Sequence, residues 1–242
     1  MPTTEKKYFC IECGSQSDER LVWCPICWRE GSYIPVVHRP GHHKIVHESA
    51  QIFSAKDLMA DGKQRIKAGG AWDLIFKEGI GRPYFIVLYG QPGSGKTVLS
   101  LLLANQWPHK TLFVSLEEGL QFTIREKIAW LSIDNVDFCV PSDEADFFDK
   151  IQGYDLVVVD SAQKINIDAS PLRDMVNDDN RNLILICQIT SEGKARGGPH
   201  VIHEGDVELH LPAFGKFELR KNRFGYTREG VWRENAVSDD LP

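Results

Sequence analysis

Residues 85–104 read FIVLYGQPGSGKTVLSLLLA, in which a glycine-rich segment separates two apolar runs. The β-branched run Phe85–Tyr89 predicts a buried strand, and Val98–Ala104 predicts a helix. Between them, GQPGSGKT at residues 90–97 fits the pattern G-x-x-x-x-G-K-[ST] at every position. The stretch therefore predicts a phosphate-binding loop (P-loop) between a strand and the N-terminus of a helix.

This loop has the residue types needed to bind a nucleoside triphosphate. Its backbone N–H groups and the dipole of the following helix favour phosphate oxygens. Lys96 is expected to reach the β- and γ-phosphates, and the Thr97 hydroxyl to ligate Mg²⁺. The predicted ATP-binding residues are Gly90, Gln91, Pro92, Gly93, Ser94, Gly95, Lys96, Thr97 and, further along the chain, Asp160.

Composition describes an ordinary globular protein. The 242 residues are 42% hydrophobic and 26% charged, which suits one large domain with a small appendage. The chain has no apolar stretch long enough to cross a bilayer, and its start, MPTTEKKYFC, has no signal-peptide core. We therefore expect a cytoplasmic location and no membrane partner. The net charge of −6 argues against indiscriminate nucleic-acid binding but leaves room for local basic patches.

Four cysteines near the N-terminus follow the spacing C-x2-C-x10-C-x2-C. Two C-x-x-C turns can aim four thiolates at one metal in the tetrahedral geometry that suits Zn²⁺. Four protein ligands leave no open position, so the site would be structural; a redox pair or free thiols are the alternatives. The predicted zinc ligands are Cys10, Cys13, Cys24 and Cys27.

The patterns predict three segments: a zinc finger at residues 1–33, a linker at 34–52 and an α/β ATPase domain at 53–242. The linker holds four histidines whose spacing is not diagnostic of a metal site, so a solvated linker is favoured over a second metal site. In the large domain we expect a mainly parallel sheet with antiparallel strands at its C-terminal end.

Three further apolar runs end in polar residues suited to nucleotide hydrolysis. Residues 111–116 lead to Glu117 and Glu118, where a carboxylate beside the P-loop strand could orient or deprotonate water. Acids at a helix N-terminus are the alternative. Residues 154–161, YDLVVVDS, predict a strand whose Asp160 holds Mg²⁺. Residues 183–189 carry Gln188, either a contact to the γ-phosphate or an ordinary residue at a strand end.

Residues 190–206 read as a long glycine-rich loop. Lys194 and Arg196 lie there among glycines that allow close approach to a phosphate backbone, so both are predicted to bind DNA; a disordered surface loop is the alternative. After this loop, VELHL, KFELRKN and GVWRE read as short antiparallel strands in a locally basic region.

Several of these segments together resemble one group of proteins. They are CPICW, GQPGSGKT, VSLEEGLQ, VVVDSAQ, QITSEGKARGGP and, at residues 221–225, KNRFG. In this order they resemble the RecA-like ATPases and, within them, the RadA (or Sms) family of bacterial DNA repair proteins. The chain departs from that family in having VSLEEG and Gln188 where VSGEES and His are usual. The resemblance covers the family's ATPase core, and we expect the chain to lack the Lon-protease-like domain that follows this core in the family.

The resemblance implies a RecA-like core that assembles into rings or filaments with ATP between subunits. It implies that Glu117 is the catalytic base and that Gln188 links the γ-phosphate to the 190–206 loop. Lys221 and Arg223 match a basic pair that reaches the neighbouring subunit's phosphates, although a solvated basic strand is the alternative.

The leading hypothesis is a Mg²⁺-dependent, DNA-stimulated ATPase. It would bind single-stranded DNA and act in recombination, repair or branch processing. Its expected partners are single-stranded DNA, further copies of itself, and a recombinase or replicative helicase. The alternatives are a KaiC-like regulatory ATPase and a helicase-loading accessory factor, both of which would act through protein partners.

Overall fold

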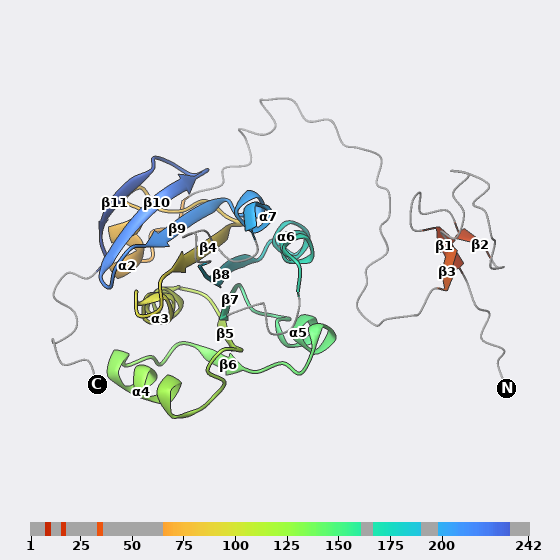
Figure 1. Cartoon of the computed structure of the whole chain (residues 1–242), viewed down its shortest axis with the longest axis horizontal. Coiled ribbons are helices and arrows are strands. Elements are labelled where there is room, and N and C mark those ends of the chain that lie inside the picture. The colour runs from red at the N-terminus through yellow and green to blue at the C-terminus, as the bar shows by residue number, and fades with distance from the viewer. Residues whose placement is uncertain are drawn as a thin grey trace. The chain divides into compact units, whose positions relative to one another are not determined.

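The computed structural model in Figure 1 describes residues 8–10, 16–17, 33–35, 65–160, 167–189 and 198–232. The chain divides into two compact units, Met1–Gln51 and Ile52–Pro242. In the first unit, β1 (Tyr8–Cys10) pairs antiparallel with β2 (Gln16–Ser17) on one side and β3 (Tyr33–Pro35) on the other. Cys10 ends β1, whereas the other three predicted zinc ligands lie outside the described residues, so the zinc site stays a prediction.

The second unit is built on one eight-stranded sheet in the order β11-β10-β9-β4-β8-β7-β5-β6. Neighbouring strands from β9 to β6 pair in parallel, whereas β9–β10 and β10–β11 pair antiparallel. The predicted class, a mainly parallel α/β sheet with antiparallel C-terminal strands, is confirmed. The strands are β4 (Phe85–Gly90), β5 (Thr111–Ser115), β6 (Asp137–Cys139), β7 (Leu156–Asp160), β8 (Asn182–Gln188), β9 (Val207–Leu211), β10 (Lys216–Asn222) and β11 (Arg228–Val231).

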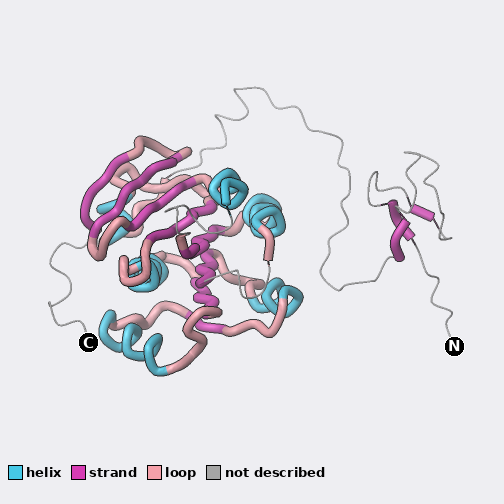
Figure 2. The backbone as a smooth tube through the Cα atoms, viewed as in Figure 1, coloured by secondary structure: helices cyan, strands magenta, loops and turns pink. Residues whose placement is uncertain are grey.

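Helices cover both faces of this sheet, as Figure 2 shows. One face packs against α2 (Gly70–Ile75), α3 (Lys96–Gln106) and α4 (Phe122–Leu131). The other packs against α5 (Glu144–Lys150), α6 (Ala169–Asp178) and α7 (Gly198–Glu204).

The strand before the P-loop shows why both faces are apolar. In β4, Ile86 and Leu88 join the core under α2 and α3, while Phe85, Val87 and Tyr89 join the core under α6 and α7. All five are at most 2% exposed, as expected for a strand in a parallel sheet that is buried on both faces. This rigid strand fixes the position of the loop that follows Gly90.

Three expectations need correction. The strand that ends next to Glu117, β5, is separated from β4 by β7 and β8, and β8 is the neighbour of β4 on that side. The segment VELHL forms β9, which runs parallel to β4 and antiparallel only to β10. Residues 190–206 are not all loop, because α7 occupies Gly198–Glu204; residues 190–197, with Lys194 and Arg196, lie outside the described residues. β8 and β9 run parallel on either side of β4, so the chain between them must cross over, and α7 lies on this crossover.

Candidate nucleotide-binding site

The P-loop connects β4 to α3 by a tight turn in which the Ser94 N–H donates to the Gln91 carbonyl over 3.1 Å. Gly95 directly precedes α3 with a φ of 88°, a left-handed conformation in which a side chain would be strained. A methyl group at Gly90 would lie 2.4 Å from the Leu211 carbonyl oxygen at the end of β9. Glycine is therefore required at both positions. The first backbone N–H groups of α3 have no partner within the helix, so they are available to a ligand in the loop.

Lys96 begins α3 and its side chain folds back over the loop. Its Nζ donates to the carbonyls of Gly90 (3.0 Å) and Gln91 (2.9 Å). Burial lowers the pKa of the Lys96 ammonium, while the nearby carboxylates of Asp160 and Glu117 act in the opposite direction. An ammonium held near backbone oxygens and two acids is placed to exchange these contacts for phosphate oxygens.

Thr97 and Asp160 lie together, as the sequence predicted for two Mg²⁺ ligands. The Thr97 hydroxyl donates to Asp160 Oδ2 over 3.0 Å. Asp160 ends β7 and is 3% exposed, and its Oδ1 has no hydrogen-bond partner among the described residues. Burial, helped by the charges of Glu117 and Glu118, raises the pKa of the Asp160 carboxyl to about 6.

This donor set fits a magnesium ion. Mg²⁺ prefers oxygen ligands, and it is usually held by one or two carboxylates together with phosphate oxygens and water. The buried, unpartnered oxygen of Asp160 and the adjacent hydroxyl of Thr97 would supply the protein's part of such a shell. A cation there would also offset the cost of burying the ionised carboxylate.

Glu117 and Gln188 meet at the same edge of the sheet. The Gln188 side chain at the end of β8 donates to Glu117 Oε1 over 3.0 Å. Glu117 follows β5, and its backbone N–H donates to the Asp160 carbonyl over 2.8 Å, which ties the ends of β5 and β7 together. Glu117 is exposed, whereas Glu118 pairs with Lys127 of α4. Of the two acids, Glu117 is the more exposed at this edge.

The P-loop, Asp160, Glu117 and Gln188 lie at the same edge of the sheet, but Lys221 and Arg223 lie elsewhere. In the sheet register, Asn222 pairs with Val207, which pairs with Ile86 near the start of β4. Gly90 lies four residues further along β4, which is about 13 Å at the rise of a strand. Lys221 and Arg223 are thus at the opposite end of the sheet from the P-loop of their own chain.

Both basic side chains are bonded within their own chain. Lys221 Nζ donates to the carbonyls of Ile202 (3.1 Å), His203 (3.0 Å) and Gly205 (2.5 Å), at the C-terminal end of α7. Arg223 donates to Asp206 over 3.0 Å.

Sequence reasoning missed Asp206, which is 4% exposed and joins α6, β4 and the turn after β10. It accepts two hydrogen bonds from Arg173 of α6 (2.6 and 2.9 Å) and one from the Phe85 N–H of β4, besides that from Arg223. The local sequence offers one weak signal, Gly205, a residue type common directly after a helix, and this glycine does not indicate the partners of Asp206.

Comparison with known proteins supports the P-loop assignment. Residues 82–174 match the model of an AAA domain family. Over 93% of its length the chain is 26% identical to the DNA repair protein RadA of Rickettsia felis. It is 28% identical over 92% of its length to the RadA of Mycolicibacterium smegmatis, and 26% identical over 98% to that of Campylobacter jejuni.

The chain is a distant homologue of the RadA DNA repair proteins. It spans 57% of the length of the Rickettsia RadA and 56% of the Mycolicibacterium RadA. Among solved structures it is similar to a KaiC-like protein of Pyrococcus horikoshii, with a TM-score of 0.56 and 18% identity over 70% of this chain and 92% of that one. This second likeness concerns the fold alone.

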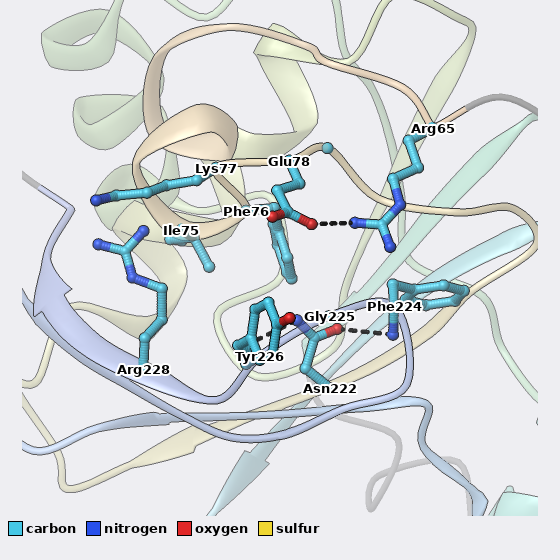
Figure 3. A pocket seen from close by; sticks show the side chains of 11 residues that line it. Arg65, Ile75, Phe76, Lys77, Glu78, Asn222, Phe224, Gly225, Tyr226 and Arg228 are labelled. Carbon is cyan, nitrogen blue, oxygen red and sulfur yellow. Dashed lines mark hydrogen bonds and ion pairs between the residues drawn. The ribbon is translucent and has the colours of Figure 1, made fainter.

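The KNRFG segment, which carried part of the resemblance to RadA, forms a turn beside a small pocket (Figure 3). The pocket has a volume of about 130 Å³ and is lined by Asn222, Phe224 and Tyr226 of the turn and by residues 75–79. Asn222 closes the turn by bonding to the Phe224 N–H (3.0 Å) and the Tyr226 carbonyl (3.2 Å). None of the nucleotide-site residues predicted from the sequence lines this pocket.

Two further predictions from the sequence concern Lys194 with Arg196 and the location of the protein. The described residues include no helix long and apolar enough to cross a membrane. Lys194 and Arg196 have no described position, so their contact with DNA stays a prediction.

Proposed function

We propose that this chain is a Mg²⁺-dependent ATPase that binds single-stranded DNA and acts in recombination, repair or branch processing. The observation that carries the proposal is the convergence of Lys96, the Thr97–Asp160 pair and the Glu117–Gln188 pair at one edge of the sheet. The distant homology to RadA supports the DNA-related part.

Each residue of this edge has a proposed role. Lys96 offsets the charge of the β- and γ-phosphates, and Thr97 with Asp160 holds the metal ion. When bound, Mg²⁺ supplies positive charge to the phosphate oxygens. Glu117 holds and deprotonates the attacking water, and its carboxylate is oriented by the amide of Gln188.

Gln188 also has a proposed role in coupling the nucleotide site to residues 190–197. It lies at the end of β8, two residues before the segment that contains Lys194 and Arg196. A change at the γ-phosphate that alters the Gln188–Glu117 contact would move the start of this segment. Nucleotide state would then control DNA affinity through residues 190–197.

The homo-oligomer is proposed because Lys221 and Arg223 are too far from their own P-loop to act there. A head-to-tail contact between copies would bring these side chains to the neighbour's phosphates, as an arginine finger does in other NTPases. Lys221 and Arg223 would first have to leave the end of α7 and Asp206.

The zinc finger and the cytoplasmic location complete the proposal. A short segment with two C-x-x-C pairs gains most of its folding free energy from the metal. Zinc content measured on the intact protein and on a Cys24→Ser variant tests this part.

Salt dependence of DNA binding tests the proposed DNA contact. The logarithm of the affinity for a fluorescent oligonucleotide should fall linearly with the logarithm of salt concentration. Replacing both Lys194 and Arg196 by Ala should reduce the slope by about 1.4, since each single-strand phosphate contact contributes about 0.7. The matched control replaces Lys67 and Lys216, two exposed lysines of the described residues, and should leave the slope unchanged. Binding that is insensitive to salt would contradict the proposal.

The same binding assay separates the alternatives. A chain that hydrolyses ATP but fails to bind DNA under any nucleotide condition fits a KaiC-like regulatory ATPase. Retention of such a chain by a replicative helicase would favour the helicase-loading role.

A further inference from the structure

The segment proposed to contact DNA, residues 190–197, reads TSEGKARG and contains no aromatic side chain. Lys194 and Arg196 can hold phosphates, but this segment has no ring on which a base could stack. Surfaces that bind single strands combine cations, which follow the phosphates, with aromatic rings, which stack on the bases. Both kinds of side chain line the pocket beside the KNRFG turn.

An exposed ring and an apolar base form the middle of this pocket (Figure 3). Tyr226 lines it and is 82% exposed, while Asn222 bonds to the Tyr226 carbonyl over 3.2 Å and so fixes the backbone that carries the ring. Ile75 and Phe76, at the end of α2, also line the pocket and are at most 4% exposed. The volume is about 130 Å³, and a cavity of about 150 Å³ holds benzene, so one six-membered ring fits.

Cations lie on both sides of the Tyr226 ring. Figure 3 shows Lys77 and Arg228 together on one side and Arg65 on the other. Arg228 donates to the carbonyl of Leu74 over 3.0 Å, which holds its guanidinium beside the pocket. Arg65 pairs with Glu78 over 3.0 Å, but both side chains are exposed, so this ion pair contributes little and can give way to a phosphate. The described lining residues thus carry three cations and one acid, although the whole chain has a net charge of −6.

The pocket is separate from the nucleotide site and from Arg223. Its turn lies at the end of the sheet opposite to the P-loop. Arg223 bonds to Asp206, which Arg173 of α6 also contacts, whereas the pocket is lined by the end of α2. Because α2 and α6 pack on opposite faces of the sheet, a second copy that meets Arg223 on the α6 side does not have to cover the pocket.

We propose that this pocket binds single-stranded DNA, with one base against the Tyr226 ring and the flanking phosphates at Lys77 and Arg65. Each base of a strand is flanked by a phosphate on either side, so a ring between two cations matches the order of groups along a single strand. Stacking and charge carry little sequence information, so binding should depend little on sequence. This inference rests on the proposed function, since it names a surface for the DNA that the chain is proposed to bind.

Binding of two fluorescent oligonucleotides by the full chain tests the pocket. One is an oligothymidylate, and the other has the same number of phosphates but carries abasic sugars, so it cannot stack. Tyr226→Leu should weaken binding of the oligothymidylate about tenfold and leave binding of the abasic strand within twofold of wild type. Tyr226→Phe keeps the ring and should bind both strands as the wild type does. The matched control is Phe122→Leu, which removes a 72% exposed ring at the start of α4 and should change neither affinity.

Salt dependence tests the cations in the same assay. Lys77→Met should reduce the slope of the logarithm of affinity against the logarithm of salt concentration by about 0.7 for both strands, because one phosphate contact is lost. Lys216→Met, which replaces an exposed lysine at the start of β10, should leave the slope unchanged.

The contrary outcomes are distinct. Unchanged affinity of Tyr226→Leu for the oligothymidylate, or equal weakening of both strands, would overturn the stacking of a base on this ring. If Tyr226→Leu instead lowers the mass of the assembly in sedimentation and weakens both strands with it, the pocket is an interface between copies. If both pocket variants bind as wild type while replacement of Lys194 and Arg196 by Ala abolishes binding, this inference fails and the proposed DNA contact stands. A wild-type chain that binds neither strand would overturn both.

Discussion

Asp160 ends β7 with a side chain that is almost wholly excluded from water, and one of its oxygens has no partner among the described residues. Burial raises the pKa of this carboxyl from 3.8 to about 6. The folded chain therefore favours the protonated form more than the unfolded chain does. The contribution of this group to the free energy of unfolding is complete below pH 4 and is lost as the pH rises through 6.

Replacing Asp160 by Asn should therefore stabilise the protein in the absence of nucleotide and added Mg²⁺. At pH 7.5 the gain should be about 2–3 kcal/mol, because the amide carries no charge to bury and still accepts from Thr97. Near pH 4 the gain should vanish, since the wild-type carboxyl is then neutral. Thermal unfolding at both pH values measures this, with the exposed Asp174→Asn as control. Equal destabilisation at both pH values would contradict the account.

At the scale of residues, the sequence predicted which side chains lie together wherever a short motif fixes the geometry. Thr97 and Asp160 lie 63 positions apart, yet the P-loop and the buried strand LVVVD predicted that both would meet at one metal. Asp206 was not predicted, because the three residues that donate hydrogen bonds to its carboxylate lie in separate parts of the chain. No local pattern records such contacts.

At the scale of elements, the C-terminal end of α7 depends on one lysine. The last carbonyls of a helix have no partner within the helix, and Lys221 Nζ satisfies three carbonyls at this end. Among the residues that the structure describes, the Arg223 side chain bonds only to Asp206, which Arg173 also contacts. The Arg223 side chain is 49% exposed. Lys221 should therefore matter more to stability than Arg223.

Lys221→Met keeps the aliphatic stem but removes the donor, which leaves three carbonyls unpaired. The free energy of unfolding should fall by about 1–3 kcal/mol, and hydrogen exchange in α7 should become faster. Urea unfolding measures the first and exchange by mass spectrometry the second. The control is Lys216→Met, an exposed lysine on the same strand. If the two variants have the same free energy of unfolding and the same hydrogen exchange in α7, the proposed role of Lys221 at α7 is wrong.

The elements that the sequence predicted were those with long apolar runs, such as β4, β5, β7 and β8. The direction of β9 was not predicted, because VELHL alternates in exposure as an antiparallel strand would. Its parallel pairing with β4 depends on the crossover through α7. Seven residues that begin with Gly and Pro give too weak a helical pattern to reveal α7 from the sequence.

At the scale of the whole molecule, the separation of Lys221 and Arg223 from their own P-loop predicts a catalytic site shared between copies. Mixing two inactive variants tests this. Lys96→Ala removes the P-loop lysine, and Arg223→Ala removes the proposed finger at a small cost in stability. In an equal mixture, about a quarter of the sites should combine an intact P-loop with an intact Arg223 from a neighbour.

ATP turnover of the mixture should then recover to about a quarter of the wild-type rate, while each variant alone stays inactive. Each variant alone, diluted with an equal volume of buffer, gives the baseline rate of ATP turnover. An inactive mixture of folded, assembled variants would place the catalytic residues within a single copy. That result would remove the argument for a head-to-tail assembly.

ATP turnover of the zinc-containing protein with and without single-stranded DNA tests the central claim most directly. Lys96→Ala serves as the blank, because it removes the ammonium that is proposed to bind the phosphates. The account predicts slow turnover without DNA, strong stimulation by single-stranded DNA, and neither in the variant. Turnover that no DNA changes would contradict the proposed coupling between the nucleotide site and residues 190–197.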